Sequence, residues 1–583
     1  MHAWPLNDTA STVFPLTSRA NVGEIFPDPI TPLNASTGFF ANLEKGWSDA
    51  YVATGAWDHD LYDKAIAHNP ICVFGSYIYI NMSFMRLFGV RVPGFTPEAV
   101  DLQYFGDMPG IPSYESEKRD FDEDPAASEK AGAWLMGEVL GATDLAPFDA
   151  DRVRILDIRR SRPDLSALTD ADLAARITSF NDDLRHFFCN HIVASLAAGV
   201  GLGAVAQVCA AIGKPELSLT LVAGIGDVDS AGASKGMWSL SRKIRASAEV
   251  SAAFDAGSDD LMGRLQALNS VEAKAFRVEL DAFLDEWDFR GPSEWEIRAA
   301  TWGGNPELAL SMIERMRMVG DDEAPDAKNA LRAAEREAAS TGIREALAGN
   351  PEGQAVLPQF EAALHAAALW VRARERQRTS AAMLIHELRL AAMELGRRGV
   401  AAGTLPEGKR IFMLFADELG DYVANPAAFT DTLAERERVY LDLFDYTPPF
   451  VVDGQPAEYT AWQRRDAHTA TVLTAGEVLT GVSGCPGVAR GRARVVLHPD
   501  AADEFEPGDV LVAPITDPSW TPLFVGASAV VVNVGAPFSH AAIVSRELGI
   551  PCVVSAIDAT VRIPDGALLE VDGTTGAVTV LEV

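Results

Sequence analysis

One histidine near the C-terminus, His540, stands where its ring could act as a nucleophile toward phosphate. It follows the Val-rich run ASAVVVNVG and the breakers Gly535 and Pro537, and it opens the Ala-rich stretch HAAIVSRELG. This pattern predicts a buried strand, a turn, and a helix that begins at Ser539 and ends near Gly549. The first turn of a helix has unpaired N–H groups and the positive end of the helix dipole, so the position favours an anion such as phosphate. On this stretch alone, the histidine could equally cap the helix or fill a gap in the core.

A second group of residues that could do chemistry is the stretch RERQR. Arg374 and Arg378 are four residues apart, so on a helix they share a face and could clamp a phosphoryl group from one side. Glu375 would either orient an arginine or accept the proton of a substrate hydroxyl. The ordinary alternative is a solvated helix face, where Arg and Glu at this spacing usually lie.

The elements that must position these residues change in character along the chain. With 583 residues, the chain exceeds the size at which a single core stops growing, so several domains are expected. Residues 1–110 are mixed in character, and residues 111–465 are rich in Ala, Leu, Glu and Arg at helical spacing. After a linker at 466–483, residues 484–583 place short Val-rich runs between Gly and Pro turns, which is typical of strands. The predicted fold is multidomain: a large, mainly α-helical domain followed by a small α/β domain that carries the histidine.

Composition argues against several classes of protein. Hydrophobic residues make up 48% and charged residues 22% of the chain, and its net charge of −33 disfavours nucleic acid and anionic membranes as partners. The five cysteines are scattered and form no Cys-x-x-Cys pair, which is typical of buried thiols in a reducing cytoplasm. The N-terminus lacks the basic and apolar regions of a signal peptide. We therefore expect a cytoplasmic protein that binds neither nucleic acid nor membrane.

Some stretches resemble known sites without the context that those sites need. The Ala- and Gly-rich run at 192–213 is long enough to span a bilayer, but Ala and Gly insert poorly, so a buried helix is expected. Its GLGAVA fits a dinucleotide fingerprint, yet it lies within a predicted helix and not after a strand, and no P-loop is present. His186 and His191 are five apart and face different sides of a helix, and His386 with Glu387 is isolated, so no metal site is predicted.

The stretch around His540, GAPFSHAAIVSRELGIPCVV, resembles the phosphohistidine signature of the phosphoenolpyruvate-utilising enzymes. The resemblance implies that His540 is transiently phosphorylated and that Ser539 donates a hydrogen bond to the phosphate. It also implies that the small C-terminal domain swivels between two active sites, with the linker placed to allow this. One residue departs from the family pattern, because Phe538 stands where Thr is usual.

Further stretches resemble, in order and spacing, the acceptor-binding domain of the rifampicin phosphotransferase branch of this family. They are TSRANVGEIFPDPITPLN, FGSYIYINMS, QYFGDMPGIPSY, LVAGIGDVDSA, FRGPSEWEI and RERQR. At the position of RERQR, relatives have the pattern Arg-Glu-x-x-Lys. The resemblance implies that Arg290, Glu294, Arg19 and Asn21 help to bind the substrate, in addition to the RERQR clamp. A second departure is Phe289, where many relatives have His.

The same resemblance implies that ATP binding and acceptor phosphorylation take place on different subunits. The sequence shows no ATP-grasp stretch and no pyruvate-binding barrel, a partition like that of phenylphosphate and cresol-phosphorylating synthases, which keep the ATP-grasp module on a separate subunit. We therefore expect a phosphotransferase subunit that binds no cofactor itself, with Mg²⁺ and ATP on an ATP-grasp partner. The acceptor is expected to be a small organic molecule with a hydroxyl, either phenol-like or an alcohol. The tryptophans near the candidate motifs suggest an aromatic or apolar pocket, although Trp in helical domains is more often core: Trp287, Trp295, Trp302 and Trp370.

Three alternatives stay open on the sequence alone. The chain could be a component of an antibiotic-type phosphotransferase, or a non-catalytic phosphohistidine carrier or regulatory protein. It could also keep the fold and have lost the chemistry. RERQR and FRGPSEWEI favour an enzyme, because a pure carrier has no need for acceptor-binding motifs.

Overall fold

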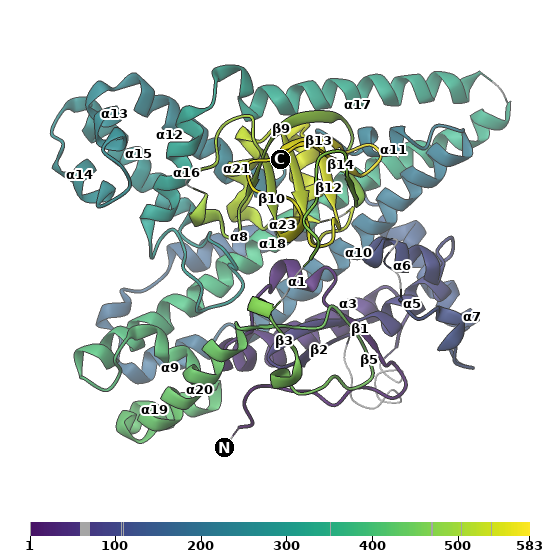
Figure 1. The fold of residues 1–583 in the computed structure, drawn as a ribbon. Helices are drawn as coiled ribbons and strands as arrows, with labels where there is room; N and C mark the ends of the chain where they lie inside the picture. The colour runs from purple at the N-terminus through teal and green to yellow at the C-terminus, as the bar shows by residue number, and fades with distance from the viewer. Residues whose placement is uncertain are drawn as a thin grey trace. The chain divides into compact units, whose positions relative to one another are not determined.

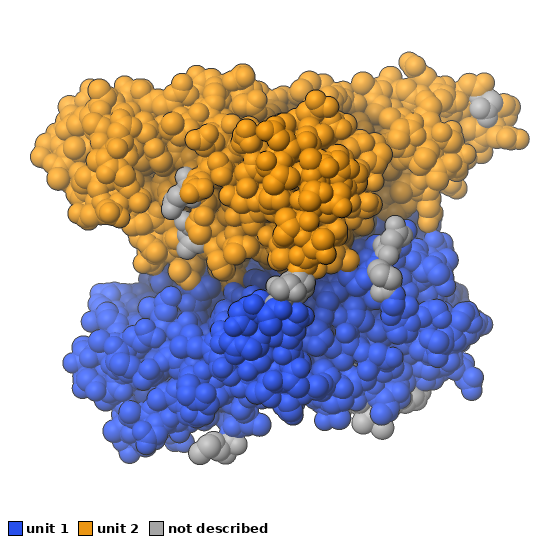
Figure 2. Space-filling model, in the orientation of Figure 1, with its two compact units in different colours: residues 1–200, 295–299, 369–468 blue, residues 201–294, 300–368, 469–583 orange. Residues whose placement is uncertain are grey.

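A computed structural model describes residues 2–58, 70–106, 108, 110–349, 351–467, 470–502, 504–537 and 539–583. They form two compact units, each made from several stretches of the chain (Figures 1 and 2). Unit 1 comprises residues 1–200, 295–299 and 369–468, and unit 2 comprises residues 201–294, 300–368 and 469–583. One division, between 468 and 469, lies close to the predicted boundary at 465, whereas the units have no boundary near 110. They also divide within two long helices, α10 (Asn181–Ala211) and α18 (Pro351–Ala401).

Unit 1 combines a small antiparallel sheet with many helices. The sheet has the strand order β2-β3-β1-β5. Its hairpin turns at Gly75 and Ser76, whose φ angles are 54° and 61°, and two residues with positive φ are what a tight type I′ turn requires. The strands of unit 1 are β1 (Leu16–Ser18), β2 (Ile71–Phe74), β3 (Tyr77–Asn81), β4 (Tyr446–Thr447), β5 (Val451–Asp453) and β6 (Gln463–Arg464). Besides parts of α10 and α18, its helices are α1 (Val22–Ile25), α2 (Pro32–Asn34), α3 (Glu44–Ala53), α5 (Met82–Arg91), α6 (Pro97–Phe105), α7 (Pro125–Trp134), α8 (Ala146–Arg160), α9 (Asp170–Thr178), α19 (Leu419–Ala424) and α20 (Thr430–Leu443).

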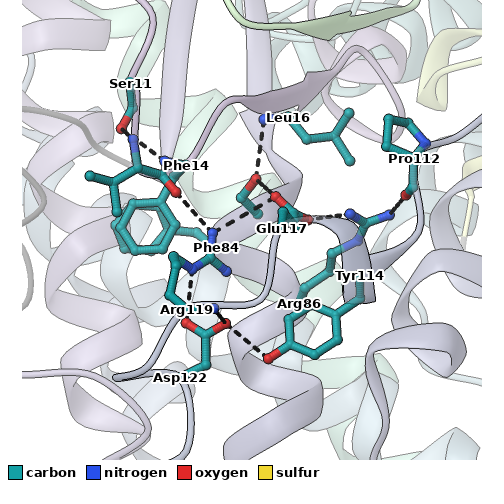
Figure 3. Close-up of polar contacts among 12 residues, drawn as sticks. Ser11, Phe14, Leu16, Phe84, Arg86, Pro112, Tyr114, Glu117, Arg119 and Asp122 are labelled. Atoms are coloured by element: carbon teal, nitrogen blue, oxygen red, sulfur yellow. Dashed lines mark hydrogen bonds and ion pairs between the residues drawn. The ribbon is translucent and has the colours of Figure 1, made fainter.

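A buried ionic cluster in unit 1 ties α5 to the segment that follows α6 (Figure 3). Arg86 is fully buried and donates to Asp101 at 2.8 Å and 2.7 Å, to the carbonyl of Pro112 at 2.6 Å, and to Glu117. Arg119 donates to Asp122 at 2.8 Å, and Tyr114 donates to the same carboxylate at 2.9 Å. The buried Arg86 and the partly buried Arg119 thus both have carboxylate partners, as charges removed from water require.

The helical part of unit 2 follows the predicted helical periodicity. In α15 (Val271–Trp287), the buried residues Ala273, Phe276, Leu280 and Phe283 recur three and four apart, and Ser270 caps the helix by accepting from the Ala273 N–H. The other helices of this part are α11 (Leu217–Leu221), α12 (Gly232–Ala246), α13 (Ala248–Asp255), α14 (Leu261–Ala267), α16 (Pro306–Met318) and α17 (Pro325–Ala348).

The C-terminal part of unit 2 is built on an eight-stranded mixed sheet with the order β7-β14-β13-β9-β10-β11-β12-β8. Strands β9 to β12 are parallel, and the Val-rich runs of β10, β11 and β12 are buried on both faces, as is typical of parallel strands. The strands are β7 (Val478–Thr480), β8 (Val482–Cys485), β9 (Val488–Val495), β10 (Val510–Ala513), β11 (Ala529–Val532), β12 (Cys552–Val554), β13 (Leu568–Asp572) and β14 (Ala577–Glu582), with helices α21 (Thr521–Gly526), α22 (His540–Leu548) and α23 (Ala559–Arg562).

The sheet begins earlier than the predicted linker at 466–483 allows. β7 pairs with β14 and β8 pairs with β12, so residues from 478 onward belong to the sheet. Residues 468 and 469 of the predicted linker lie outside the described part of the chain. The structure therefore agrees with the prediction of a mainly helical protein that carries an α/β part. The α/β part begins at an earlier residue than predicted.

One helical stretch in the described part of the chain, Asp170–Ala211, is long and apolar enough to cross a membrane by length and composition alone. It overlaps the run at 192–213 for which the sequence predicts a buried helix. Within its most apolar window, 44% of the residues are buried in the structure. Its buried side chains include Phe187, Phe188 and Val205.

Candidate functional site

His540 lies where two neighbouring parallel strands end. β10 is followed by a loop that holds Thr516 and Asp517, and β11 is followed by the loop that leads to His540. The carboxyl ends of adjacent parallel strands meet at one edge of the sheet, which is the usual position of a ligand site in an α/β fold. The predicted strand, turn and helix around His540 are confirmed, because α22 starts at His540 and ends at Gly549, whose φ is 66°.

The His540 ring is held by residues of its own α/β part. Its Nδ1 lies 3.3 Å from the Thr516 hydroxyl, its Nε2 lies 3.2 Å from the Thr521 hydroxyl, and Phe524 packs edge-on with ring centroids 5.9 Å apart. Only 1% of His540 is exposed. Ser539 caps the helix, and its hydroxyl accepts from the Ala542 N–H at 3.3 Å. Its own hydroxyl hydrogen is not used in that bond, so the predicted role as a phosphate donor stays a prediction.

A carboxylate on the same helix docks into a glycine loop of the helical part of unit 2. Glu547 accepts from the N–H groups of Ile225 at 2.8 Å and Gly226 at 3.0 Å, and from the Asn329 amide at 2.6 Å. Gly224 and Gly226 have φ angles of 55° and 69°, which turn successive N–H groups toward one point and form an anion nest. The family stretch LVAGIGDVDSA thus has a structural role, because it binds the helix that carries His540.

The predicted substrate residues Arg290 and Glu294 form a buried ion pair at 2.8 Å in unit 2. Their loop reaches the His540 neighbourhood through Ser293, whose N–H donates to Asp517 at 2.9 Å. Ser293 has a φ of 53°, which a serine adopts only when its surroundings hold it there. Phe289, where many relatives have His, is fully buried. Phe538, the other departure from the family pattern, lies outside the described residues.

The predicted clamp of Arg374, Glu375 and Arg378 lies in unit 1, on α18. All three side chains are buried, so they do not form the solvated face that is usual at this spacing. Glu375 pairs with Arg374, which favours its role as the group that orients an arginine. Arg378 forms no hydrogen bond or ion pair with any residue the structure describes, and its buried Nε has no partner. A buried guanidinium without a carboxylate is costly, so this position favours an anion.

Arg19 and Asn21, also in unit 1, have local structural roles. The Arg19 guanidinium donates to the carbonyls of Ile78 at 3.0 Å, Phe26 at 2.7 Å and Pro27 at 3.1 Å, which uses its donors within the protein. Asn21 has a φ of 65° and is the central residue of a tight turn closed by the bond from the Val22 N–H to the Ala20 carbonyl. Neither is brought to the RERQR residues by a hydrogen bond that the structure describes.

The tryptophans and histidines that the sequence singles out separate into different roles. Trp302 is buried and stacks with Phe283, and Trp370 donates to the Val139 carbonyl at 3.0 Å. His186 pairs with Asp151 at 2.8 Å, which raises the pKa of His186, chiefly through this hydrogen bond. No group of three or more His, Cys, Asp or Glu side chains among the described residues could hold a metal ion.

Several residues around the candidate site are not found by sequence reasoning. Thr516, Asp517 and Thr521 approach His540 or its neighbours only through the packing of β10 and α21, and no local motif marks them. Glu547 lies within the family signature, yet its partners are about 320 residues away in the sequence. His191, weighed from the sequence only as a metal ligand, lies near both clamp arginines.

Comparison with known proteins adds an independent observation. The family model of the PEP-utilising enzyme mobile domain matches residues 505–576, the part that holds His540. The model of the rifampicin phosphotransferase fourth domain matches residues 190–375. Two parts of the chain thus match domains of the PEP-utilising enzymes.

The chain is also similar to several curated proteins. An uncharacterized protein of Mycobacterium tuberculosis is 29% identical over 98% of this chain and 62% of its own length. The rifampicin phosphotransferase of Streptomyces sviceus is 28% identical over 52% of this chain and 34% of its own. The phosphoenolpyruvate synthase of Aeropyrum pernix is 43% identical over 23% of this chain and 18% of its own. The chain thus spans 62% of the length of the Mycobacterium tuberculosis protein and less of the other two.

The Glu547 contact yields a first prediction. In Glu547→Ala, the amides of Ile225 and Gly226 lose their acceptor, so deuterium uptake should rise in peptides that cover 221–231. The variant should also be destabilised by about 1–3 kcal/mol, because buried donors are left unpaired. Hydrogen–deuterium exchange by mass spectrometry measures this, with Glu570→Ala as the control, since Glu570 pairs with Arg490 at an exposed site. Unchanged uptake at 221–231 would contradict the contact.

The glycine loop yields a second prediction. Gly224→Ala should lower the melting temperature more than Gly226→Ala, although both positions need a positive φ. A Cβ at Gly224 would lie 2.4 Å from the backbone nitrogen of Ala333, whereas a Cβ at Gly226 would meet its nearest atom, on Asn329, at 3.6 Å. Thermal unfolding of both variants checks the order. An equal loss in the two would mean that the φ angle alone sets the cost, about 1–2 kcal/mol for each position.

Proposed function

We propose that this chain is the phosphohistidine and acceptor component of a phosphotransferase. His540 takes a phosphoryl group and passes it to the hydroxyl of a small organic acceptor. The similarity to rifampicin phosphotransferases and to the mobile domain of PEP-utilising enzymes supports a phosphotransferase. The observation that carries the proposal is the position of His540, in the first turn of α22 within the matched mobile domain.

The first half-reaction places phosphate on the His540 ring. A ring nitrogen attacks phosphorus, an N–P bond forms, and the bond to the donor's leaving oxygen breaks. Backbone N–H groups at the start of α22 and the hydroxyls of Thr516 and Thr521 are the groups around the ring that can donate to phosphoryl oxygens. The donor in this proposal is ATP with Mg²⁺, bound by an ATP-grasp module on a separate subunit, and the reaction takes place in the cytoplasm.

The second half-reaction uses the buried arginines of unit 1. The acceptor oxygen forms an O–P bond as the N–P bond breaks, and the bonding electron pair returns to the imidazole. Charge spreads over the equatorial oxygens of the transferring group, so it is stabilised best by fixed positive groups in a site that excludes water. Arg378 has its guanidinium unpaired and Arg374 is oriented by Glu375, which fits them for this role.

The role of His540 is tested by trapping the intermediate. With an ATP-grasp partner, Mg²⁺ and ATP but no acceptor, phosphate should accumulate on His540, because the second step is blocked. The label should be lost in acid and kept in base. His540→Ala should remove all labelling, whereas His498→Ala, at an exposed histidine of the same α/β part, should label normally. Phosphate found on another residue, or labelling of His540→Ala, would overturn the proposal.

The role of the clamp is tested by separating the two half-reactions. Arg378→Ala and Arg374→Ala should form phospho-His540 normally, but should transfer it roughly 10² to 10³ times more slowly, as for the loss of one transition-state donor. The matched control is Arg376→Ala on the same helix, since Arg376 pairs with Asp149. The decay of preformed phosphohistidine is measured with phenol and with benzyl alcohol as test acceptors. Equal decay in all three variants would reject the clamp and favour a non-catalytic carrier.

A further inference from the structure

Among the buried polar atoms of unit 1 that lack a hydrogen-bond partner in the described part of the chain, four belong to residues on or next to the RERQR helix. They are Nδ1 of His191, Nε1 of Trp295, Oε1 of Gln377 and Nε of Arg378. Each of these residues is at most 4% exposed. Buried polar atoms in folded proteins are nearly always paired, so several unpaired atoms at one place indicate a site for a polar ligand.

His191, Trp295 and Arg378 lie together, where α10 and α18 meet the segment 295–299. The rings of His191 and Trp295 are 5.4 Å apart and edge-on. The positive charges of Arg374 and Arg378 both lower the pKa of His191, so both guanidinium groups lie near its ring. Gln377, next to Arg378 in the sequence, donates its amide to Asp151 at 2.6 Å, and this leaves its oxygen as an unused acceptor.

His191 is an uncharged hydrogen-bond acceptor in this cluster. Burial, followed by the two guanidinium groups, lowers the pKa of His191 to about 3, so the ring is neutral at neutral pH. A hydrogen bond between the ring and the backbone of Arg374 acts in the opposite direction. Nδ1 has no partner among the described residues, and in the neutral ring that carries its hydrogen on Nε2 it is a hydrogen-bond acceptor.

Apolar rings surround these atoms. Phe188 and Phe26 pack against Trp295 with ring centroids 5.2 Å and 6.0 Å away. All three side chains are buried. A site of this composition favours a ligand whose body is apolar and whose few polar atoms are hydrogen-bonded at fixed positions.

We propose that this cluster binds the acceptor, a molecule with a hydroxyl on an apolar, ring-sized body, and that His191 Nδ1 accepts the hydrogen of that hydroxyl. The proposal deepens the proposed function and rests on it. During transfer, the O–P bond forms while the N–P bond of phospho-His540 breaks, and the hydroxyl proton ends on the His540 ring, which keeps the electron pair of the broken bond. Glu375 is engaged by Arg374, whereas His191 Nδ1 and Gln377 Oε1 are free acceptor atoms, so His191 Nδ1 holds the hydroxyl through its hydrogen bond.

The test compares probes that differ by one hydroxyl. Binding of 4-fluorobenzyl alcohol, 4-fluorophenol and 4-fluorotoluene to the full chain is measured by fluorine NMR. At least one hydroxylated probe should bind about fivefold or more tightly than 4-fluorotoluene, as expected for one added hydrogen bond. His191→Phe should abolish this preference, and His191→Asn should retain it, because the Asn oxygen can replace Nδ1. The control, His186→Phe, alters a histidine of the same helix and should keep the preference.

The result is independent of the His540 chemistry, because binding needs no phosphoryl group. The preference for the hydroxyl should persist in His540→Ala. Equal binding of all probes, survival of the preference in His191→Phe, or its loss in His191→Asn would overturn the site. An intact preference without phosphorylation of His540 would instead reject the proposed function and leave the binding site standing.

Discussion

The burial of α22 on every side is the constraint on which the rest of unit 2 depends. All nine residues of this helix are buried, including His540, Arg546 and Glu547. A polar group taken out of water must find a partner, so each of these residues determines what lies around it. His540 lies between two threonine hydroxyls, Arg546 donates to the Gly484 carbonyl at 2.8 Å, and Glu547 occupies the glycine nest. The apolar face of the helix then packs with α21 in a core shared with α12, α15 and α16.

Features that depend on neighbouring residues could be predicted from the sequence, and features that depend on distant ones could not. Ser539 and Gly549 mark the ends of α22 through local capping chemistry, so its bounds follow from the sequence. The start of the sheet at 478 could not be predicted, because β7 and β8 are short and become strands by pairing with distant ones. β7 pairs with β14, and β8 pairs with β12. Glu547 and its nest are likewise separated by hundreds of residues. The shared face of Arg374 and Arg378 follows from helical spacing, but their burial depends on how the helices of unit 1 pack.

The buried arginines show how structural and functional charges differ in the same fold. Arg86 and Arg290 are each held by carboxylates, and Arg19 by three main-chain carbonyls, so their charges are satisfied within the protein. Arg378 is equally buried and has no such partner in the described part of the chain. Because an unpaired buried charge lowers stability, its presence is better explained by a ligand than by the fold. Two buried tryptophans differ in the same way. The ring N–H of Trp370 donates a hydrogen bond within the protein, whereas the ring N–H of Trp295 has no partner among the described residues.

The proposed transfer from His540 would require that its burial be reversible. A ring that is 1% exposed excludes water, which protects a phosphohistidine from hydrolysis, but it also excludes the donor and the acceptor. The polar contacts that hold α22 suit a reversible arrangement, because Glu547 and Asp517 bind main-chain N–H groups and both sides regain hydrogen bonds to water when they part. A pairing with a buried arginine would instead leave an uncompensated charge on separation. The pairing of carboxylates with backbone amides therefore keeps the docked state specific, and the cost of release is set by the apolar core that α22 shares with α12, α15 and α16.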